Sequence, residues 1–308
     1  MKVIRTLNSS TRKRVKDPVV TLGNFDGIHL GHQLILKKLS ARARRLKTSA
    51  VVYTFEPHPL KVVAPAKSPP LLLDLEDKKT LLESLGIDFL VLARFTRGFA
   101  SKHPREFAED ILVKGLGVRE VWVGEDFSFG RGRRGTVEYL KELGERYGFR
   151  VFVIPPYKKG GSVVSSSRIR ALVSEGEVKK AAVLLARPYS IKGSVVAGKE
   201  IGKVIGFPTA NLKVSSELLP KNGVYAVRAS FDGIRYDGVV NIGTAPTFGG
   251  KKKTVEVHLF DFKDDIYGKK MRVEFIKRLR DEKHFKTKEA LVRQINRDAE
   301  RAKKVFTL

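Results

Sequence analysis

The 308-residue chain contains no cysteine. Disulfides, thiolate zinc sites and cysteine nucleophiles are therefore excluded, which fits a reducing compartment. No apolar stretch approaches the ~20 residues that a membrane-spanning helix needs, and residues 1–18 lack the apolar segment of a signal peptide. We therefore expect a cytoplasmic protein that has no membrane partner.

Acidic residues are scarce: 33 Asp and Glu stand against 60 Lys and Arg, which gives a net charge of +27. The excess is spread along the chain, with +15 in residues 1–186 and +12 in residues 187–308. A field of this sign attracts polyanions, whether nucleotides or nucleic acids. The basic residues are not interleaved with aromatic residues on one element, as a platform for single strands requires. General surface charging is thus the favoured interpretation, and we expect no specific nucleic-acid partner.

The first half of the chain alternates between short apolar runs and amphipathic segments. Strands are predicted at Val19–Leu22, Ala50–Phe55, Phe89–Ala93, Glu120–Val123 and Val151–Ile154. Helices are predicted at His32–Leu46, Leu75–Leu85, Pro104–Leu116, Thr136–Tyr147 and Arg168–Leu185. This alternation predicts an α/β domain with a parallel sheet, whose ligands bind where the strands end.

From residue 187 the predicted strands follow one another closely. They are Tyr189–Val196, Val224–Phe231, Ile234–Ile242, Thr254–Phe260 and Met271–Leu279, and a helix at Thr287–Lys304 closes the chain. Closely spaced strands with Gly, Pro and Asn between them favour an antiparallel barrel or sandwich. We therefore predict two domains, residues 1–186 and 187–308, which also fits the length of the chain.

The turn after the first predicted strand, Gly23–His32, leads directly into a helix. Glycines allow the backbone to approach a ligand closely, and a helix N-terminus offers N–H groups to phosphates. His29 and His32 add side-chain donors at the same place. The pattern suits adenylyl transfer, which needs donors where charge develops on the α-phosphate. The alternative is a tight turn with incidental histidines.

The His29-x-Gly31-His32 element resembles the signature of the nucleotidyltransferase superfamily, and its setting resembles the bacterial FAD synthetase branch. The resemblance implies a Rossmann-like domain with His29 and His32 as catalytic residues. ATP-binding residues implied by it are Gly23, Phe25, Asp26 and Gly31, with Ser166, Ser167 and Arg170 gripping the phosphates. From its position before the last helix of this half, Ser167 is also predicted to be an N-cap.

Two further segments follow predicted strands and fit the same branch. Phe55, His58 and Pro59 come after the second strand, where an aromatic ring and prolines can wall a flavin site; without the resemblance they indicate only a rigid loop. Asp126 and Phe129 come after the fourth strand. The resemblance implies that these five residues bind flavin, although some relatives carry asparagine in place of Asp126.

The segment from Gly193 to Asn211 begins the second predicted domain and ends in Pro208-Thr209-Ala210-Asn211. Its glycines and lysines equally suit a phosphate loop or a hairpin, and its spacing is not that of a P-loop. The Pro-Thr-Ala-Asn run is similar to the riboflavin kinase signature. The resemblance implies that Thr209 and Asn211 hold Mg²⁺, which prefers hard oxygen ligands. ATP-binding residues implied by it are Gly198, Gly202, Lys203 and Pro208.

Downstream, Val255, Val257 and Leu259 alternate with Glu256, His258 and Phe260, so Glu256 and His258 share one strand face. Taken alone, Glu256 is indistinguishable from a solvated strand residue. The kinase resemblance makes it the general base that activates the ribityl hydroxyl of riboflavin. It also places Arg280 at the flavin.

The resemblance covers Val19 to Lys304 and implies a bifunctional enzyme. The barrel, a Greek-key type closed by a helix, phosphorylates riboflavin to FMN, and the α/β domain adenylylates FMN to FAD. ATP, riboflavin and FMN are the expected partners, and Mg²⁺ is the expected cofactor. The alternatives are a nucleotidyltransferase for another phosphate monoester with a flavin-binding barrel, and a basic nucleic-acid-binding protein. The sequence leaves the oligomeric state open.

Overall fold

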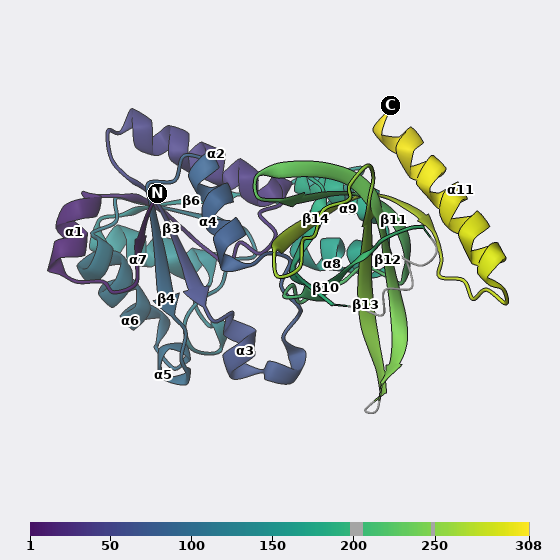
Figure 1. Ribbon diagram of the computed structural model, residues 1–308. Helices are drawn as coiled ribbons and strands as arrows, with labels where there is room; N and C mark the ends of the chain where they lie inside the picture. The colour runs from purple at the N-terminus through teal and green to yellow at the C-terminus, as the bar shows by residue number, and fades with distance from the viewer. Residues whose placement is uncertain (198–205, 248–249, 308) are drawn as a thin grey trace. The chain divides into compact units, whose positions relative to one another are not determined.

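The computed structural model describes residues 1–197, 206–247 and 250–307. The chain forms two compact units, Met1–Ser165 and Ser166–Leu308. In Figure 1 the first unit runs from purple to teal and the second from teal to yellow. The predicted residues Gly198, Gly202 and Lys203 lie outside the described residues.

A six-stranded sheet forms the centre of the first unit. Its strands are β1 (Lys2–Ile4), β2 (Val19–Leu22), β3 (Ala50–Glu56), β4 (Phe89–Arg94), β5 (Glu120–Gly124) and β6 (Arg150–Ile154). Every pairing is parallel, and the order is β1-β4-β3-β2-β5-β6. The five predicted strands are confirmed, and the short edge strand β1 was not predicted. Because the strand order changes direction between β2 and β5, the carboxyl ends of these two strands are where a ligand is expected to bind.

Helices cover both faces of this sheet (Figure 1). The α-helices are α1 (Ser9–Val15), α2 (Leu30–Arg45), α3 (Pro59–Val63), α4 (Leu75–Ser84), α5 (Arg97–Ala100), α6 (Pro104–Phe107) and α7 (Val137–Tyr147). Shorter or irregular elements are the 3₁₀ turns η1 (Pro65–Lys67) and η3 (Arg131–Arg133), the π-helix η2 (Ala108–Leu116) and the hairpin β7–β8 (Lys158–Lys159, Ser162–Val163). Successive sheet residues enter two cores, one with α2 and α4 and the other with α6, η2 and α7.

The second unit contains a closed antiparallel barrel. Its strands are β9 (Tyr189–Val196), β10 (Ala210–Val214), β11 (Gly223–Phe231), β12 (Ile234–Thr247), β13 (Gly250–Leu259) and β14 (Lys270–Arg280). The order β10-β13-β12-β11-β14-β9 places β14 beside β11, which makes β11 to β14 a Greek key as predicted. Helix α11 (Lys288–Phe306), capped by Thr287, packs on the barrel, and β10 was not predicted as a strand.

The predicted helix Arg168–Leu185 is two helices, α8 (Ser166–Ser174) and α9 (Val178–Leu185). Gly176 separates them with φ of 81°, a backbone conformation that ends a helix. Helix α9 packs against β9 and β14 and buries Leu184 and Leu185. The second compact unit therefore begins at Ser166, before the boundary predicted at residue 187.

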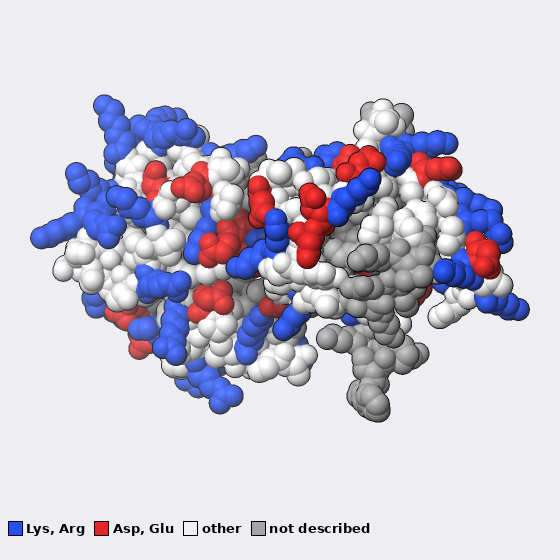
Figure 2. All heavy atoms as spheres, in the orientation of Figure 1, with Lys and Arg blue, Asp and Glu red and all other residues white. Residues whose placement is uncertain are grey.

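Charged side chains are spread over the surface. Figure 2 shows Lys and Arg side chains across the visible part of each unit, with fewer Asp and Glu side chains between them. No helix in the described ranges is long and apolar enough to cross a membrane.

Candidate active sites

The turn between β2 and α2 has an unusual backbone. Phe25, Gly27 and Ile28 adopt φ of 47°, 84° and 38°. A positive φ costs little at glycine but is unfavourable at a β-branched residue such as Ile28, which is fully buried here. Such conformations persist where the surroundings impose them and are concentrated at functional sites. The turn is therefore a rigid feature at the carboxyl end of the sheet.

Two imidazole rings are stacked at the start of α2. The ring centroids of His29 and His32 lie 3.7 Å apart with an interplanar angle of 18°. His29 is the N-cap, and its Nδ1 accepts a hydrogen bond from the His32 N–H at 3.4 Å. In its neutral form His29 therefore carries its proton on Nε2, which makes that nitrogen a donor. A Cβ at Gly31 would lie 3.2 Å from the His29 ring, so glycine leaves room for this arrangement.

His32 is held in its neutral form by its surroundings. Burial lowers the pKa of His32 well below its usual value, and the nearby His29 and Lys78 lower it further. Its Nδ1 atom is buried and has no hydrogen-bond partner among the residues that the structure describes. The predicted pair thus lies together, and its neutral member His32 can donate a hydrogen bond to a phosphate beside His29.

Asp26 was predicted to bind ATP, and in the structure it stabilises a loop. Its buried carboxylate accepts hydrogen bonds from the backbone N–H groups of Leu72, at 3.0 and 3.1 Å, and of Leu73, at 3.3 Å. It therefore fixes the segment before α4 against the turn.

Asn24 and Lys78 also fix the turn, and sequence reasoning missed both. The Lys78 Nζ donates to the Asn24 carbonyl at 2.9 Å, and the Asn24 side chain lies 3.3 Å from the His58 Nε2. His58 in turn caps α3, because its Nδ1 accepts from the Leu60 N–H at 3.2 Å. These contacts join the turns after β2 and β3, so His58, which precedes α3 and its first residue Pro59, lies beside the turn that carries the histidine pair.

Aromatic side chains form a wall at the carboxyl end of β3. Phe55 lies 5.3 Å from Phe95 and 5.6 Å from Phe99, centroid to centroid, and all three are half-buried. The predicted residue Phe129 is only 6% exposed and stacks on Phe127. Phe95 and Phe99 were missed because their helical and loop context gives no motif.

The remaining predicted residues of this site belong to other segments of the chain than the turn between β2 and α2. Asp126 is exposed at the end of β5. Ser166, Ser167 and Arg170 lie in α8 of the second unit, and this helix begins at Ser166, so Ser167 is not its N-cap.

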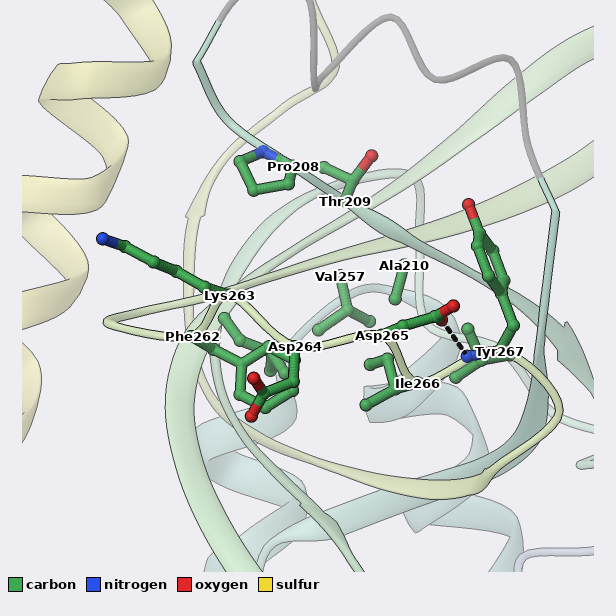
Figure 3. Close-up of a pocket in the computed structure, with 12 residues that line it drawn as sticks. Pro208, Thr209, Ala210, Val257, Phe262, Lys263, Asp264, Asp265, Ile266 and Tyr267 are labelled. Atoms are coloured by element: carbon green, nitrogen blue, oxygen red, sulfur yellow. Dashed lines mark hydrogen bonds between the residues drawn. The ribbon is translucent and has the colours of Figure 1, made fainter.

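Two cavities lie in the described part of the barrel. One, of about 320 Å³, lies between the barrel and α11; its lining includes Thr209, Asn241, Glu256, Arg280 and Ile295. We call it the helix-side pocket. The other, of about 250 Å³, is lined by Pro208 and Thr209, by Ala210, Val257 and Leu259, and by residues of the 262–267 loop. We call it the loop-side pocket; Figure 3 shows its lining, with Thr209 at its edge.

The two pockets lie on opposite faces of β13. Glu256 and His258 line the helix-side pocket, whereas Val257 and Leu259 line the loop-side pocket. Successive strand residues point to opposite faces, which confirms the predicted alternation. Thr209, immediately before β10, borders both pockets. A group held at Thr209 therefore has access to either side.

Polar side chains form a row across three strands next to Thr209. Asn211 on β10 and Asn241 on β12 are both the register partners of Glu256 on β13. Directly opposed side chains lie roughly 5 Å apart at Cβ on one face of a sheet. The predicted pair Asn211 and Glu256 thus lies together, and Asn241 joins it without having been predicted.

Arg280, a predicted flavin-binding residue, lines the helix-side pocket but is ion-paired. Its Nε and its Nη2 lie 2.8 and 2.7 Å from the Asp298 carboxylate of α11, which is 3% exposed. Its Nη1 donates to the Asp281 carbonyl at 2.8 Å. Asp298 therefore connects α11 to the barrel at the pocket, a role that the sequence did not reveal.

The backbone of the exposed Pro208 contacts the His258 ring, which lines the helix-side pocket. Its carbonyl oxygen lies 2.8 Å from the Nδ1 of His258, and the His258 ring lies edge-on to Phe207 at 5.5 Å. The Pro-Thr-Ala-Asn segment is thus connected to β13 next to Glu256.

Comparisons with known proteins identify the family of each part of the chain. Residues 11–168 match the FAD synthetase family, and residues 185–306 match the riboflavin kinase family. The bifunctional riboflavin kinase/FMN adenylyltransferase of Escherichia coli (strain K12) is 38% identical over all of this chain and 99% of its own length. The protein of the same name from Bacillus subtilis (strain 168) is 38% identical over 94% of this chain and 92% of its own.

A solved structure shares the whole architecture. A Streptococcus pneumoniae protein named as a macrolide-efflux protein superposes with a TM-score of 0.87 at 31% identity, covering 98% of this chain and 99% of its own. Both the parallel sheet and the barrel are therefore present in a known structure.

Proposed function

Because the chain belongs to the family of bifunctional riboflavin kinases/FMN adenylyltransferases, it phosphorylates riboflavin to FMN and adenylylates FMN to FAD, and we propose which side chains perform each step. ATP, riboflavin and FMN are its substrates. The histidine pair and the Glu256 row support two separate sites, one in each matched region.

In the adenylyl transfer, a phosphate oxygen of FMN attacks the α-phosphorus of ATP, a new P–O bond forms, and pyrophosphate leaves. The N-terminus of α2, which contains Gly31, and Gly23 in the turn before it receive the ATP phosphates. His29, through its Nε2–H, and His32 donate hydrogen bonds as charge builds up on the α-phosphate. No proton has to be removed from the nucleophile, because a phosphate is already ionised at neutral pH.

The flavin ring is proposed to pack on Phe55, Phe95 and Phe99, since half-buried aromatic faces are available there and offset stacking stabilises a planar ring. Phe129 supports this wall from the core through Phe107, which contacts both Phe129 and Phe99. Asp126, Ser166, Ser167 and Arg170 keep the roles that the family resemblance implies, and Arg170 is suited to bidentate phosphate binding.

In the kinase reaction, we propose that the loop-side pocket takes the nucleoside of ATP and the helix-side pocket takes riboflavin. The observation that carries this assignment is Thr209, which borders both pockets. Glu256 removes the proton from the ribityl 5′-hydroxyl, whose oxygen then attacks the γ-phosphorus while ADP leaves. Asn241, Phe207 and Arg280 shape the flavin side of this site.

The side chains around Thr209 fit a magnesium ion. The Thr209 hydroxyl and the Asn211 amide oxygen are hard ligands beside the Glu256 carboxylate, and Mg²⁺ is commonly held by few protein oxygens together with substrate phosphates. When bound, Mg²⁺ supplies charge neutralisation on the transferred phosphate. Placement in the cytoplasm and the lack of a specific nucleic-acid partner remain predictions from the sequence.

Two fragments test the assignment of activities to parts of the chain. A fragment of residues 166–308 should convert riboflavin to FMN and should form no FAD. A fragment of residues 187–308 should have the same activity but unfold at lower temperature, because it lacks the apolar contacts of α9 with β9 and β14. If the folded longer fragment consumed no ATP with riboflavin, the assignment would be wrong.

A further inference from the structure

Lys78 is a lysine that faces inward on α4. It lies one turn before Leu82, which is fully buried, and residues four apart share a helix face. Its amino group donates to the Asn24 carbonyl at 2.9 Å, in the turn that precedes the histidine pair. The next residue, Lys79, instead pairs with Glu76 at the surface, at 2.8 Å. The inward lysine therefore has a local role that its neighbour lacks.

The charges around Lys78 and His32 are unequal. Burial lowers the pKa of Lys78, and the carboxylates of Asp26 and Glu56 oppose that change. Two basic groups act on His32: His29, at the start of the same helix, and Lys78, on α4. Both disfavour a positive charge on the His32 ring. The arrangement thus favours a positive charge on the lysine and leaves His32 neutral.

We propose that Lys78 is a positioning residue of adenylyl transfer: it fixes the turn through Asn24 and keeps His32 a neutral hydrogen-bond donor. The inference rests on the proposed role of His32. Neutrality matters because two imidazolium rings 3.7 Å apart would repel each other and separate. A pair that stays stacked keeps its N–H groups aimed at one phosphate, which is what preorganised stabilisation requires.

The pH dependence follows from the sign of this effect. Protonation of His32 should abolish the productive pair, so FAD formation should fall on the acid side. Removing the Lys78 charge should make His32 easier to protonate, which moves the acid limb of kcat/KM for FMN to higher pH. On the acid limb, kcat/KM for FMN in the uncharged Lys78 variants should be about tenfold lower than in the wild type at the same pH.

Three variants separate the charge from the hydrogen bond. Lys78→Met removes both, Lys78→Gln keeps an N–H donor without the charge, and Lys78→Arg keeps both. Lys79→Met is the matched control, and riboflavin phosphorylation by the same full-length proteins reports whether each variant is folded. We expect the acid limb to move in the Met and Gln variants and to stay in the Arg and Lys79 variants.

An independent readout is the NMR titration of the His32 ring, assigned by comparison with His32→Asn. Its midpoint should rise in Lys78→Gln in parallel with the kinetic limb. The proposal is overturned if FAD formation depends on His32 but neither the limb nor the titration moves in Lys78→Gln. If instead His32→Asn retains full FAD formation, the proposed function of the pair fails, and that result is distinguishable from the first.

Discussion

The two sites both use ATP as the donor, but the nucleophile is ionised at one site and protonated at the other. The nucleophile for the first unit is a phosphate oxygen that is already ionised, and the proposed site offers a stacked pair of imidazoles of which His32 is neutral. The nucleophile for the barrel is a hydroxyl, and the proposed site offers a carboxylate beside two asparagines. The comparison teaches that the protonation state of the nucleophile, more than the shared phosphate donor ATP, decides which side chains a site needs.

The same comparison predicts different consequences for the two halves of the reaction. The largest effect should follow Glu256→Gln, which keeps the shape of the side chain but cannot accept the proton. Kinase kcat should fall by about 10²–10⁴-fold, while the Kd for riboflavin should change little. Glu274→Gln, at a half-buried strand position of β14, is the control. A near-normal kcat in Glu256→Gln would mean that the barrel needs no base there.

His32→Ala is the corresponding change at the adenylyl-transfer site. Loss of one preorganised donor should slow FAD formation from FMN by about 10²–10³-fold and should leave FMN formation unchanged. His103→Ala is a matched control, because His103 also caps a helix of the first unit but is exposed. An equal loss of both activities in His32→Ala would contradict two separate sites.

A structural difference between the units can be measured through Asp298→Asn. This change leaves Arg280, whose side chain is 12% exposed, without its carboxylate and should destabilise the barrel by about 3 kcal/mol. Trp122 is the single tryptophan and lies in the first unit, so its fluorescence should report an unchanged transition. Circular dichroism should show a second unfolding transition, that of the barrel, at a lower temperature. Asp237→Asn, which breaks the more exposed pair with Arg228, should cost less than about 1 kcal/mol; equal losses would contradict the account.

The smallest expected effect is that of Gly31→Ala. Its Cβ would lie 3.2 Å from the His29 ring, so the stacked pair must shift by a few tenths of an ångström. FAD formation should slow by about tenfold, because small misplacements of catalytic groups are costly. Gly98→Ala has a nearest contact of 3.8 Å and should change neither activity. Unchanged FAD formation in Gly31→Ala would show that the spacing of the pair is not critical.

Much of the fold was predictable because its periodicities are local. The parallel strands are short apolar runs, and the alternation in β13 places Glu256 correctly. Strand β10 was missed because its identity depends on pairing with β9 and β13, which no local pattern reveals. Likewise, the split between α8 and α9 depends on one glycine backbone at Gly176.

The candidate sites were predictable to different degrees. The histidine pair belongs to one continuous turn, so the sequence places it directly. The barrel site combines β10, β12, β13 and α11, and its partners Asn241 and Asp298 are far apart in the chain. Lys78 was missed for another reason: a lysine in an amphipathic helix normally indicates a solvated face, and only the fold turns it inward.

The central claim is that each site completes its own reaction without the other site. Mixing the full-length variants Glu256→Gln and His32→Ala with riboflavin and Mg-ATP tests it most directly, with FMN and FAD followed by chromatography. Each variant alone should form little FAD from riboflavin. The mixture should form FAD after a lag, because one variant releases the FMN that the other adenylylates. If the mixture accumulated FMN and formed no FAD, although Glu256→Gln adenylylates added FMN, the claim would be contradicted.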